Sequence, residues 1–235
     1  MNSTFDTYNN LTDDIFVFNL ENATTFNDII FSNIKLGQTK ALLKGNLILD
    51  NIKFLSLLVN WTAIDSNGYA LNASNILCSD CNSSSFVFAL LSSNNSTVLT
   101  HNLENIIIRN NGRADGSAPL SQGFRIHIIN NDMTINLKNI TIDNLFGSAN
   151  AVGIYANSYS ENADTVTLNM NNVSISNCDK AVNLVPAGSI IMTGNANNCN
   201  IFNCRLTPTW ANVTVTGLKE VSPFLFSKIP YLSVD

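Results

Sequence analysis

The sequence has few charged residues and no long apolar run. Asp, Glu, Lys and Arg make up 12% of the 235 residues, and the net charge is −5. Because nucleic-acid affinity depends on clustered cations, this composition argues against nucleic acid as a partner. No stretch approaches the roughly 18 apolar residues of a membrane span, and the N-terminal region lacks the basic and apolar segments of a signal peptide. We expect no membrane span, and a soluble chain that is a mature form, a fragment or a protein exported without a cleaved signal.

Histidine and cysteine are also scarce, with two and five copies. An odd number of cysteines leaves at least one thiol without an intramolecular partner. Cys178 and Cys204 could be bridged, but we expect buried, unpaired thiols because cysteine is among the most buried residue types. The CSDC segment from Cys78 to Cys81 has no second ligand pair to complete a zinc site, so no metal site is predicted. The fifth cysteine is Cys199.

Asparagine is abundant, at about one residue in six, far above ordinary usage. It opens a seven-residue pattern of Asn, apolar, any, apolar, any, polar turn-former and usually apolar. Apolar positions two and four alternate with polar positions, which is the period of a strand with one side turned inward. The copies begin at Asn33, Asn51, Asn75, Asn105, Asn139, Asn172, Asn198 and Asn212.

Further β-like runs lie between the copies, separated by Gly, Asn and Ser. Three strands per interval are what a three-sided coil needs. The sequence therefore predicts an all-β fold, a right-handed parallel β-helix (β-solenoid) with three strands per coil and about seven to eight coils. We expect the β-helix at residues 33–218, and caps or assembly segments at 1–32 and 219–235. The additional runs include Phe86 to Leu91, Phe124 to Ile129, Ala151 to Ala156 and Ala181 to Val185.

Asparagine suits the corners of such coils because it tolerates a left-handed backbone and its amide bonds to neighbours. In register, successive amides form a ladder at about 4.8 Å spacing. A second corner column is expected at position six of the pattern. The predicted first ladder consists of Asn33, Asn51, Asn75, Asn105, Asn139, Asn172 and Asn198, and the second includes Asn110, Asn144, Asn177 and Asn203.

Segments such as NVSISNC from Asn172 and NITIDNL from Asn139 resemble coils of the pectin-lyase-like right-handed β-helix superfamily. The resemblance implies architecture but leaves activity open, because members include pectate lyases, polygalacturonases, phage tailspikes and bacterial adhesins. An enzyme of this kind is expected to have clustered carboxylates, which bind calcium beside an Arg or act as acid and base. Only Asp115, Asp132 and Asp143 lie near in the sequence. Catalysis is therefore the less favoured interpretation, no cofactor is expected, and calcium would matter only for a lyase.

The best candidate for a sugar or partner site lies beside a long loop, residues 109–123. Loops on a rigid scaffold often carry function. Arg125 and His127 are expected to project outward from FRIHII, with Tyr155 outward in the next coil. The alternative is an ordinary solvated face. The full candidate set is Arg109, Arg113, Asp115, Arg125, His127 and Tyr155, of which Arg125 and His127 are the catalytic candidates if the chain is an enzyme.

Exposed N-x-S/T sequons at Asn82, Asn94 and Asn95 are glycosylation candidates. The leading functional hypothesis is a non-catalytic structural or adhesive solenoid on a cell surface, an extracellular filament or a virion exterior. It is expected to form a homo-oligomer or larger assembly, with glycans as possible partners. The alternatives are a polysaccharide lyase, a glycoside hydrolase, or a carbohydrate-binding module using the face around Arg125 and His127.

Overall fold

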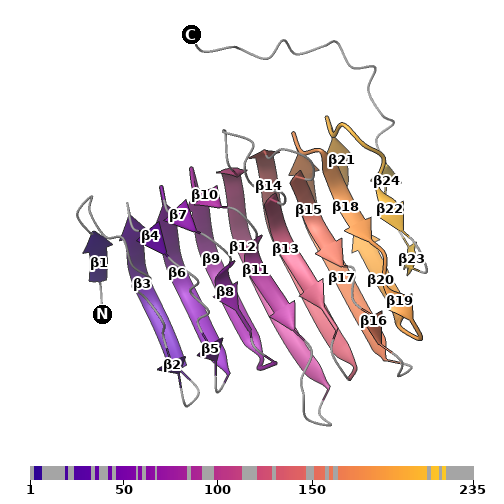
Figure 1. Ribbon diagram of the computed structural model, residues 1–235, viewed down its shortest axis with the longest axis horizontal. Coiled ribbons are helices and arrows are strands. Elements are labelled where there is room, and N and C mark those ends of the chain that lie inside the picture. The colour runs from indigo at the N-terminus through magenta and orange to yellow at the C-terminus, as the bar shows by residue number, and fades with distance from the viewer. Residues whose placement is uncertain are drawn as a thin grey trace.

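The protein is described from a computed structural model, and it consists of parallel strands stacked into a β-solenoid (Figure 1). The predicted fold class is confirmed, and no helix occurs in the described residues. Nor does that part of the chain contain a helix suited to crossing a bilayer. The described residues are 3–6, 19–20, 24–32, 35–36, 42–43, 46–56, 58–59, 62–66, 68–83, 86–91, 98–112, 121–128, 131–146, 151–156, 159–160, 164–210, 213–216 and 219–220.

One large sheet runs the length of the stack, with its strands in chain order. Each strand pairs in parallel with the corresponding strand of the next coil, as β12 does with β14. The strands are β1 (Ser3–Asp6), β3 (Thr24–Ser32), β6 (Leu47–Leu55), β9 (Leu71–Ser79), β12 (Leu99–Gly112), β14 (Met133–Phe146), β17 (Thr165–Ser176), β20 (Ile191–Asn197) and β23 (Val213–Thr216), with β21 (Asn200–Phe202) and β24 (Lys219–Glu220) continuing from β17.

The other strands form smaller parallel sheets. The second sheet consists of β8 (Thr62–Asp65), β11 (Phe86–Leu91), β13 (Ser121–His127), β15 (Ala151–Ala156), β18 (Lys180–Leu184) and β22 (Thr209–Trp210). A third contains β4 (Lys35–Leu36), β7 (Leu58–Val59) and β10 (Asn82–Ser83). Two strand pairs join β2 (Asn19–Leu20) to β5 (Leu42–Leu43) and β16 (Tyr159–Ser160) to β19 (Ala187–Gly188).

The central strands of the large sheet turn two corners at residues with a left-handed backbone. In β14 these are Asn139 and Asn144, both with φ of 54°, a conformation that asparagine adopts more readily than most residues. The corners divide β14 into a long side, residues 133–138, and a short side, residues 140–143. The second sheet supplies the third side, so each central coil has three strands, as predicted.

Both corner columns repeat along the stack, and this repeat corrects the predicted start of the solenoid. Asp28, and not Asn33, precedes Asn51 in the first column, since β3 pairs with β6 through Ile29 and Ile52. Asn33 lies outside the described residues. The first column is Asp28, Asn51, Asn75, Asn105, Asn139, Asn172 and Asn198, and the second is Ser56, Asp80, Asn110, Asn144, Asn177 and Asn203.

The predicted solenoid limits, 33 and 218, are too narrow. Strands β1 and β3 lie before residue 33 and already belong to the large sheet, and β24 extends that sheet beyond residue 218. The pattern copy that begins at Asn212 does not form a short-side strand, although its sequence matches the copies that do. Val213 pairs with Met192, which puts β23 beside the long side rather than the short side.

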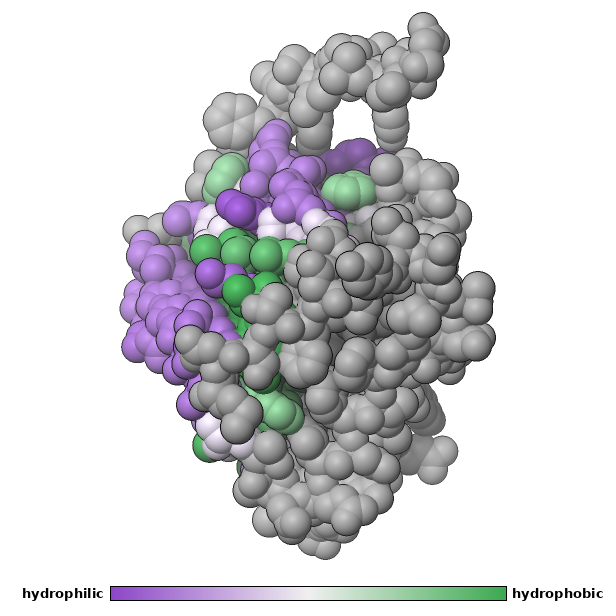
Figure 2. All heavy atoms as spheres, turned by 90° about the vertical axis from the view of Figure 1, so that its left-hand side faces the viewer, coloured by the Kyte–Doolittle hydropathy of each residue, from purple (hydrophilic) through white to green (hydrophobic). Residues whose placement is uncertain are grey.

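Apolar side chains from all three sides fill one continuous core. On β14 the inward residues alternate along the strand, with exposures of 2% or less from Met133 to Ile142. Phe88 and Phe124 stack from neighbouring strands of the third side, with ring centroids 5.2 Å apart. The core is narrow: a Cβ added at Gly153 would lie 2.8 Å from Ile175 Cγ2. Figure 2, which looks from the β1 side, shows hydrophobic residues beside a flank of hydrophilic ones.

Candidate functional site

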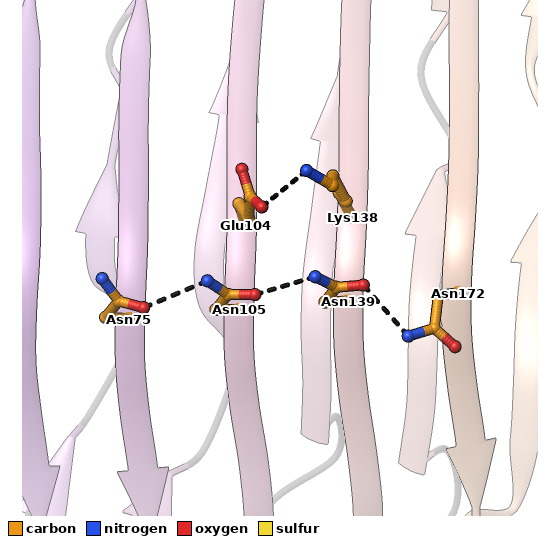
Figure 3. A network of polar contacts seen from close by, with 6 residues as sticks. All are labelled: Asn75, Glu104, Asn105, Lys138, Asn139 and Asn172. Carbon is orange, nitrogen blue, oxygen red and sulfur yellow. Dashed lines mark hydrogen bonds and ion pairs between the residues drawn. The ribbon is translucent and has the colours of Figure 1, made fainter.

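Three columns of asparagine amides tie successive coils together on the outside of the core. In the first corner column the Nδ2 of Asn105, Asn139 and Asn172 each donates to the Oδ1 of the preceding rung, at 3.1, 2.9 and 3.0 Å (Figure 3). In the second, Asn144 donates to Asn110 and Asn110 to Asp80, both at 2.9 Å. Each bond runs from a later coil to an earlier one.

Carboxylates replace the amide acceptor at a few rungs. Asp50 accepts hydrogen bonds from Ser74 Oγ at 2.6 Å and Asn75 Nδ2 at 2.8 Å, which lower the pKa of Asp50. Hydrogen bonds from Ser79 and Asn110 likewise lower the pKa of Asp80. These carboxylates are thus integrated into the ladders as acceptors, as is Asp143, which accepts from Asn177 Nδ2 at 2.6 Å.

A third ladder, which the sequence pattern did not reveal, lies on the long side. Asn136 donates to Asn102 at 2.8 Å, and Asn169 donates to Asn136 at 2.9 Å. Its members stand three residues before the first-corner Asn of the same coil, so the recurring spacing Asn-x-x-Asn was the available signal. The column is Asn72, Asn102, Asn136, Asn169 and Asn195.

The predicted site around Arg125 lies on the outer surface of the third side. Arg125 pairs in register with Tyr155, and Tyr155 with Asn183. All three are half-buried, as is His127, two residues along the strand. Lys180 Nζ lies 2.9 Å from Thr209 Oγ1. The third side therefore presents a polar row that crosses successive coils, to which sequence reasoning did not assign Lys180, Asn183 or Thr209.

Strand alternation is broken just before this row. Ala181 and Val182 are consecutive, yet both belong to the buried core, so Lys180 and Asn183, three residues apart, project on the same side. The 3.5 Å distance from Lys180 Nζ to Asn183 Oδ1 agrees with this. Gln122 and Arg125 occupy the same register positions on β13 as Lys180 and Asn183 do on β18, so they stand in the same relation to each other. Gln122 is 2% exposed, and both polar atoms of its amide lack a hydrogen-bond partner.

The structure does not bring Arg109 into this group. Arg109 is exposed on the short side, where its Nε donates to Ser79 Oγ at 3.1 Å and its register partner is Asp143. The corner at Asn110 separates the short side from β13, so residues close in sequence face different directions. Arg113 and Asp115 lie outside the described residues.

His101 is fully buried, and its Nδ1 accepts a hydrogen bond from the Leu71 backbone N–H at 3.3 Å. Within the described residues no group of three or more His, Cys, Asp or Glu side chains could hold a metal ion. Asn82 lies in β10, and Asn94 and Asn95 lie outside the described residues.

Four of the five cysteines form two close pairs of free thiols, and the fifth, Cys199, is also free and buried. Cys78 and Cys81 are buried with sulfur atoms 3.5 Å apart, and the buried amide of Asn111 accepts from the Cys81 backbone N–H at 3.0 Å. Cys178 lies one coil from Cys204, the only half-buried cysteine among the five. A hydrogen bond from Cys178 lowers the pKa of Cys204 to about 7. The same bond and burial raise the pKa of Cys178.

Cys204 is expected to be the most reactive thiol, with an alkylation rate that rises as the pH passes through about 7. The Cys178→Ala variant removes the hydrogen-bond donor, so the midpoint should move upward toward the ordinary thiol pKa. Alkylation by iodoacetamide at a series of pH values, followed by peptide mass mapping, measures both midpoints. An unchanged midpoint in the variant would show that Cys178 does not tune Cys204.

No family model, curated protein or solved structure matches the chain.

Proposed function

We propose that this protein is a non-catalytic structural or adhesive solenoid that works on the outside of a cell or on a virion. The observation that carries the proposal is the set of three amide columns, which link successive coils through asparagines used as structural connectors. A solenoid in which each coil is bonded to the next is suited to forming a stiff extended module. The ladder carboxylates Asp50, Asp80 and Asp143 act as hydrogen-bond acceptors in this arrangement.

The surroundings of Arg125 also favour a non-catalytic role. Its register partners on the two neighbouring strands are Ala89 and Tyr155, neither of which carries a carboxylate. A polysaccharide lyase or hydrolase needs such carboxylates beside the reacting sugar. The chemistry available at this face is hydrogen bonding and aromatic contact, which favours binding over turnover.

A carbohydrate-binding role for the third side is the second candidate. Gln122 supports it, because a buried amide with both polar atoms unpaired is rare in folded proteins and marks a place that a ligand or water could satisfy. A bound sugar would stack on the half-buried Tyr155 and hydrogen-bond to Arg125 and Asn183, its register partners. Adhesion through glycans would be compatible with the structural proposal.

Replacing Arg125 or His127 by alanine is expected to produce no loss of turnover, because the unaltered protein should release no product from neutral or acidic polysaccharides. The measurement is the release of reducing ends and unsaturated sugars, with and without calcium. Arg109→Ala is the matched control, since it removes an arginine from a different side. Turnover that disappears in the Arg125 and His127 variants but survives in the control would establish the enzymatic alternative instead.

Glycan-array binding separates the second candidate from the first. Binding that is lost in Gln122→Leu and Arg125→Ala, and kept in Arg109→Ala, would assign a carbohydrate site to the third side. Binding that is equally strong in all four proteins would place any glycan contact elsewhere on the chain.

A further inference from the structure

The outer surface of the long side carries two columns of uncharged residues that differ in chemistry and share one register. The Asn column is the third ladder described above. On four of the strands, a threonine stands two residues before the ladder asparagine. These threonines pair with one another from coil to coil. The Thr column is Thr100, Thr134, Thr167 and Thr193, with Thr214 next in register.

The asparagines of this surface are held in fixed orientations. Each of the bonds that link Asn72, Asn102 and Asn136 measures 2.8 Å, and the column continues to Asn195. A ladder amide uses one N–H and one acceptor site within the column, so it has a second N–H and a second lone pair for an outside partner. Threonine is stiff about χ1 because of its branched Cβ. The surface is therefore organised before any ligand arrives.

The two columns define a regular grid. Neighbouring parallel strands are about 4.8 Å apart, and residues i and i+2 on one strand are about 6.6 Å apart. A partner that uses the whole surface must repeat its own hydrogen-bonding groups at these two distances, and it gains no ion pair from the two columns. The oxygen atoms on the prism plane of hexagonal ice also repeat along two perpendicular directions, one repeat slightly shorter than the strand spacing and the other somewhat longer than the distance from residue i to i+2. Each Thr also offers a methyl group beside its hydroxyl, which restricts the positions open to surface water.

We propose that the Thr and Asn columns of the long side bind the surface of ice. Hydroxyl and amide groups held on the grid hydrogen-bond to waters at lattice positions, and these waters join the crystal. Because the groups are already fixed, little side-chain entropy is lost on binding. This inference goes beyond the proposed structural role and does not depend on it.

Other occupants fit the surface less well. The two columns contain no charged residue, which disfavours an ionic partner, and no aromatic residue, which disfavours sugars or bases held by stacking. Among the charged residues that flank the columns, Glu104 and Lys138 lie two positions beyond the Asn column and neutralise each other at 2.7 Å (Figure 3). On the other flank Asp132 lies two positions before Thr134, and its Oδ1 accepts a hydrogen bond from the Thr165 backbone N–H at 2.7 Å.

A second copy of the chain is also a poor occupant. From strand spacing and rise, the two columns cover roughly 20 by 7 Å. That area is less than half of the about 800 Å² per partner that a stable protein interface usually buries. An adsorbed crystal surface, which meets the protein as a flat lattice, needs only the face itself.

The test is thermal hysteresis, the gap between melting and freezing temperatures of a single ice crystal in a solution of the purified chain. The unaltered protein should open such a gap and give faceted crystals. The double variant Thr134→Tyr with Thr167→Tyr should abolish both effects, because two large rings interrupt the grid. Thr141→Tyr is the matched control, since Thr141 is exposed on the short side of the same strand, and it should behave like the unaltered protein.

Circular dichroism of each variant shows whether the fold is kept. If the double variant does not fold, the single variant Thr134→Lys replaces it, with the same expected loss. Absence of hysteresis in the unaltered protein would overturn the proposal, and so would equal loss in the Thr141→Tyr control. Retention on insoluble cellulose or chitin without hysteresis would overturn it in favour of a polysaccharide.

Discussion

Replacing Phe124 by alanine is expected to lower the free energy of unfolding by about 3–5 kcal/mol, the usual cost of removing a fully buried aromatic ring. Phe124 has no exposed surface, and its ring stacks on Phe88 at 5.2 Å between centroids. The cavity cannot close easily, because the strands on both sides hold β13 in register. The packing that the substitution removes lies in the middle of the stack, where the two halves of the core join.

Denaturant unfolding followed by circular dichroism measures the effect. Because each coil contacts only its neighbours, a weakened central coil should also broaden the transition, as the two ends begin to unfold separately. Phe124→Leu is the control, since it keeps most of the apolar volume and should cost less than about 1.5 kcal/mol. A loss below about 1 kcal/mol in the alanine variant would mean that the third side is not packed against the other two.

The second large effect is expected at Asn139, the central rung of the first corner ladder. Its φ of 54° is unfavourable for a β-branched residue, and a left-handed backbone costs most residues about 1–2 kcal/mol. Asn139 also donates to Asn105 and accepts from Asn172, and each such bond contributes about 0.5–1.5 kcal/mol. Asn139→Val should therefore cost about 3 kcal/mol, the sum of backbone strain and two modest hydrogen bonds.

Asn139→Gly separates the two causes, since glycine adopts the left-handed conformation freely but offers no amide. It should cost about 1–2 kcal/mol, which leaves the remainder of the valine effect to the backbone. Denaturant unfolding of the three proteins under one set of conditions gives both differences. Equal stability of the valine and glycine variants would contradict the left-handed corner at this position.

The sequence predicted the corners and the inward faces because each has a simple chemical cause. Alternation of apolar and polar residues determines which side of a strand is buried, and Asn, Asp and Gly adopt the left-handed corner at lower cost than most other residues. The same logic explains the main error. Because the seven-residue pattern required Asn at its first position, it missed Asp28. Asp28 tolerates the same left-handed backbone and occupies the corner that was predicted for Asn33.

The candidate site was predicted less well, because the direction in which a side chain points depends on the corners between strands. Arg125 and Tyr155 lie in the β-like runs of two successive coils and both project outward by strand alternation, so their adjacency followed from the sequence. Arg109 lies on the other side of the Asn110 corner, and the angle of that corner is a tertiary property. The broken alternation at Ala181 and Val182, which brings Lys180 beside Asn183, likewise has no signal in a two-residue period.

The location of the native protein tests the proposed function most directly. An antibody against the folded chain, applied to intact, unpermeabilised cells and to purified particles from the source organism, should label their outer surface. Permeabilised cells and a cytosolic marker protein serve as controls for access. Labelling that appears only after permeabilisation, together with a monodisperse monomer in the soluble interior, would contradict a structural or adhesive role outside the cell.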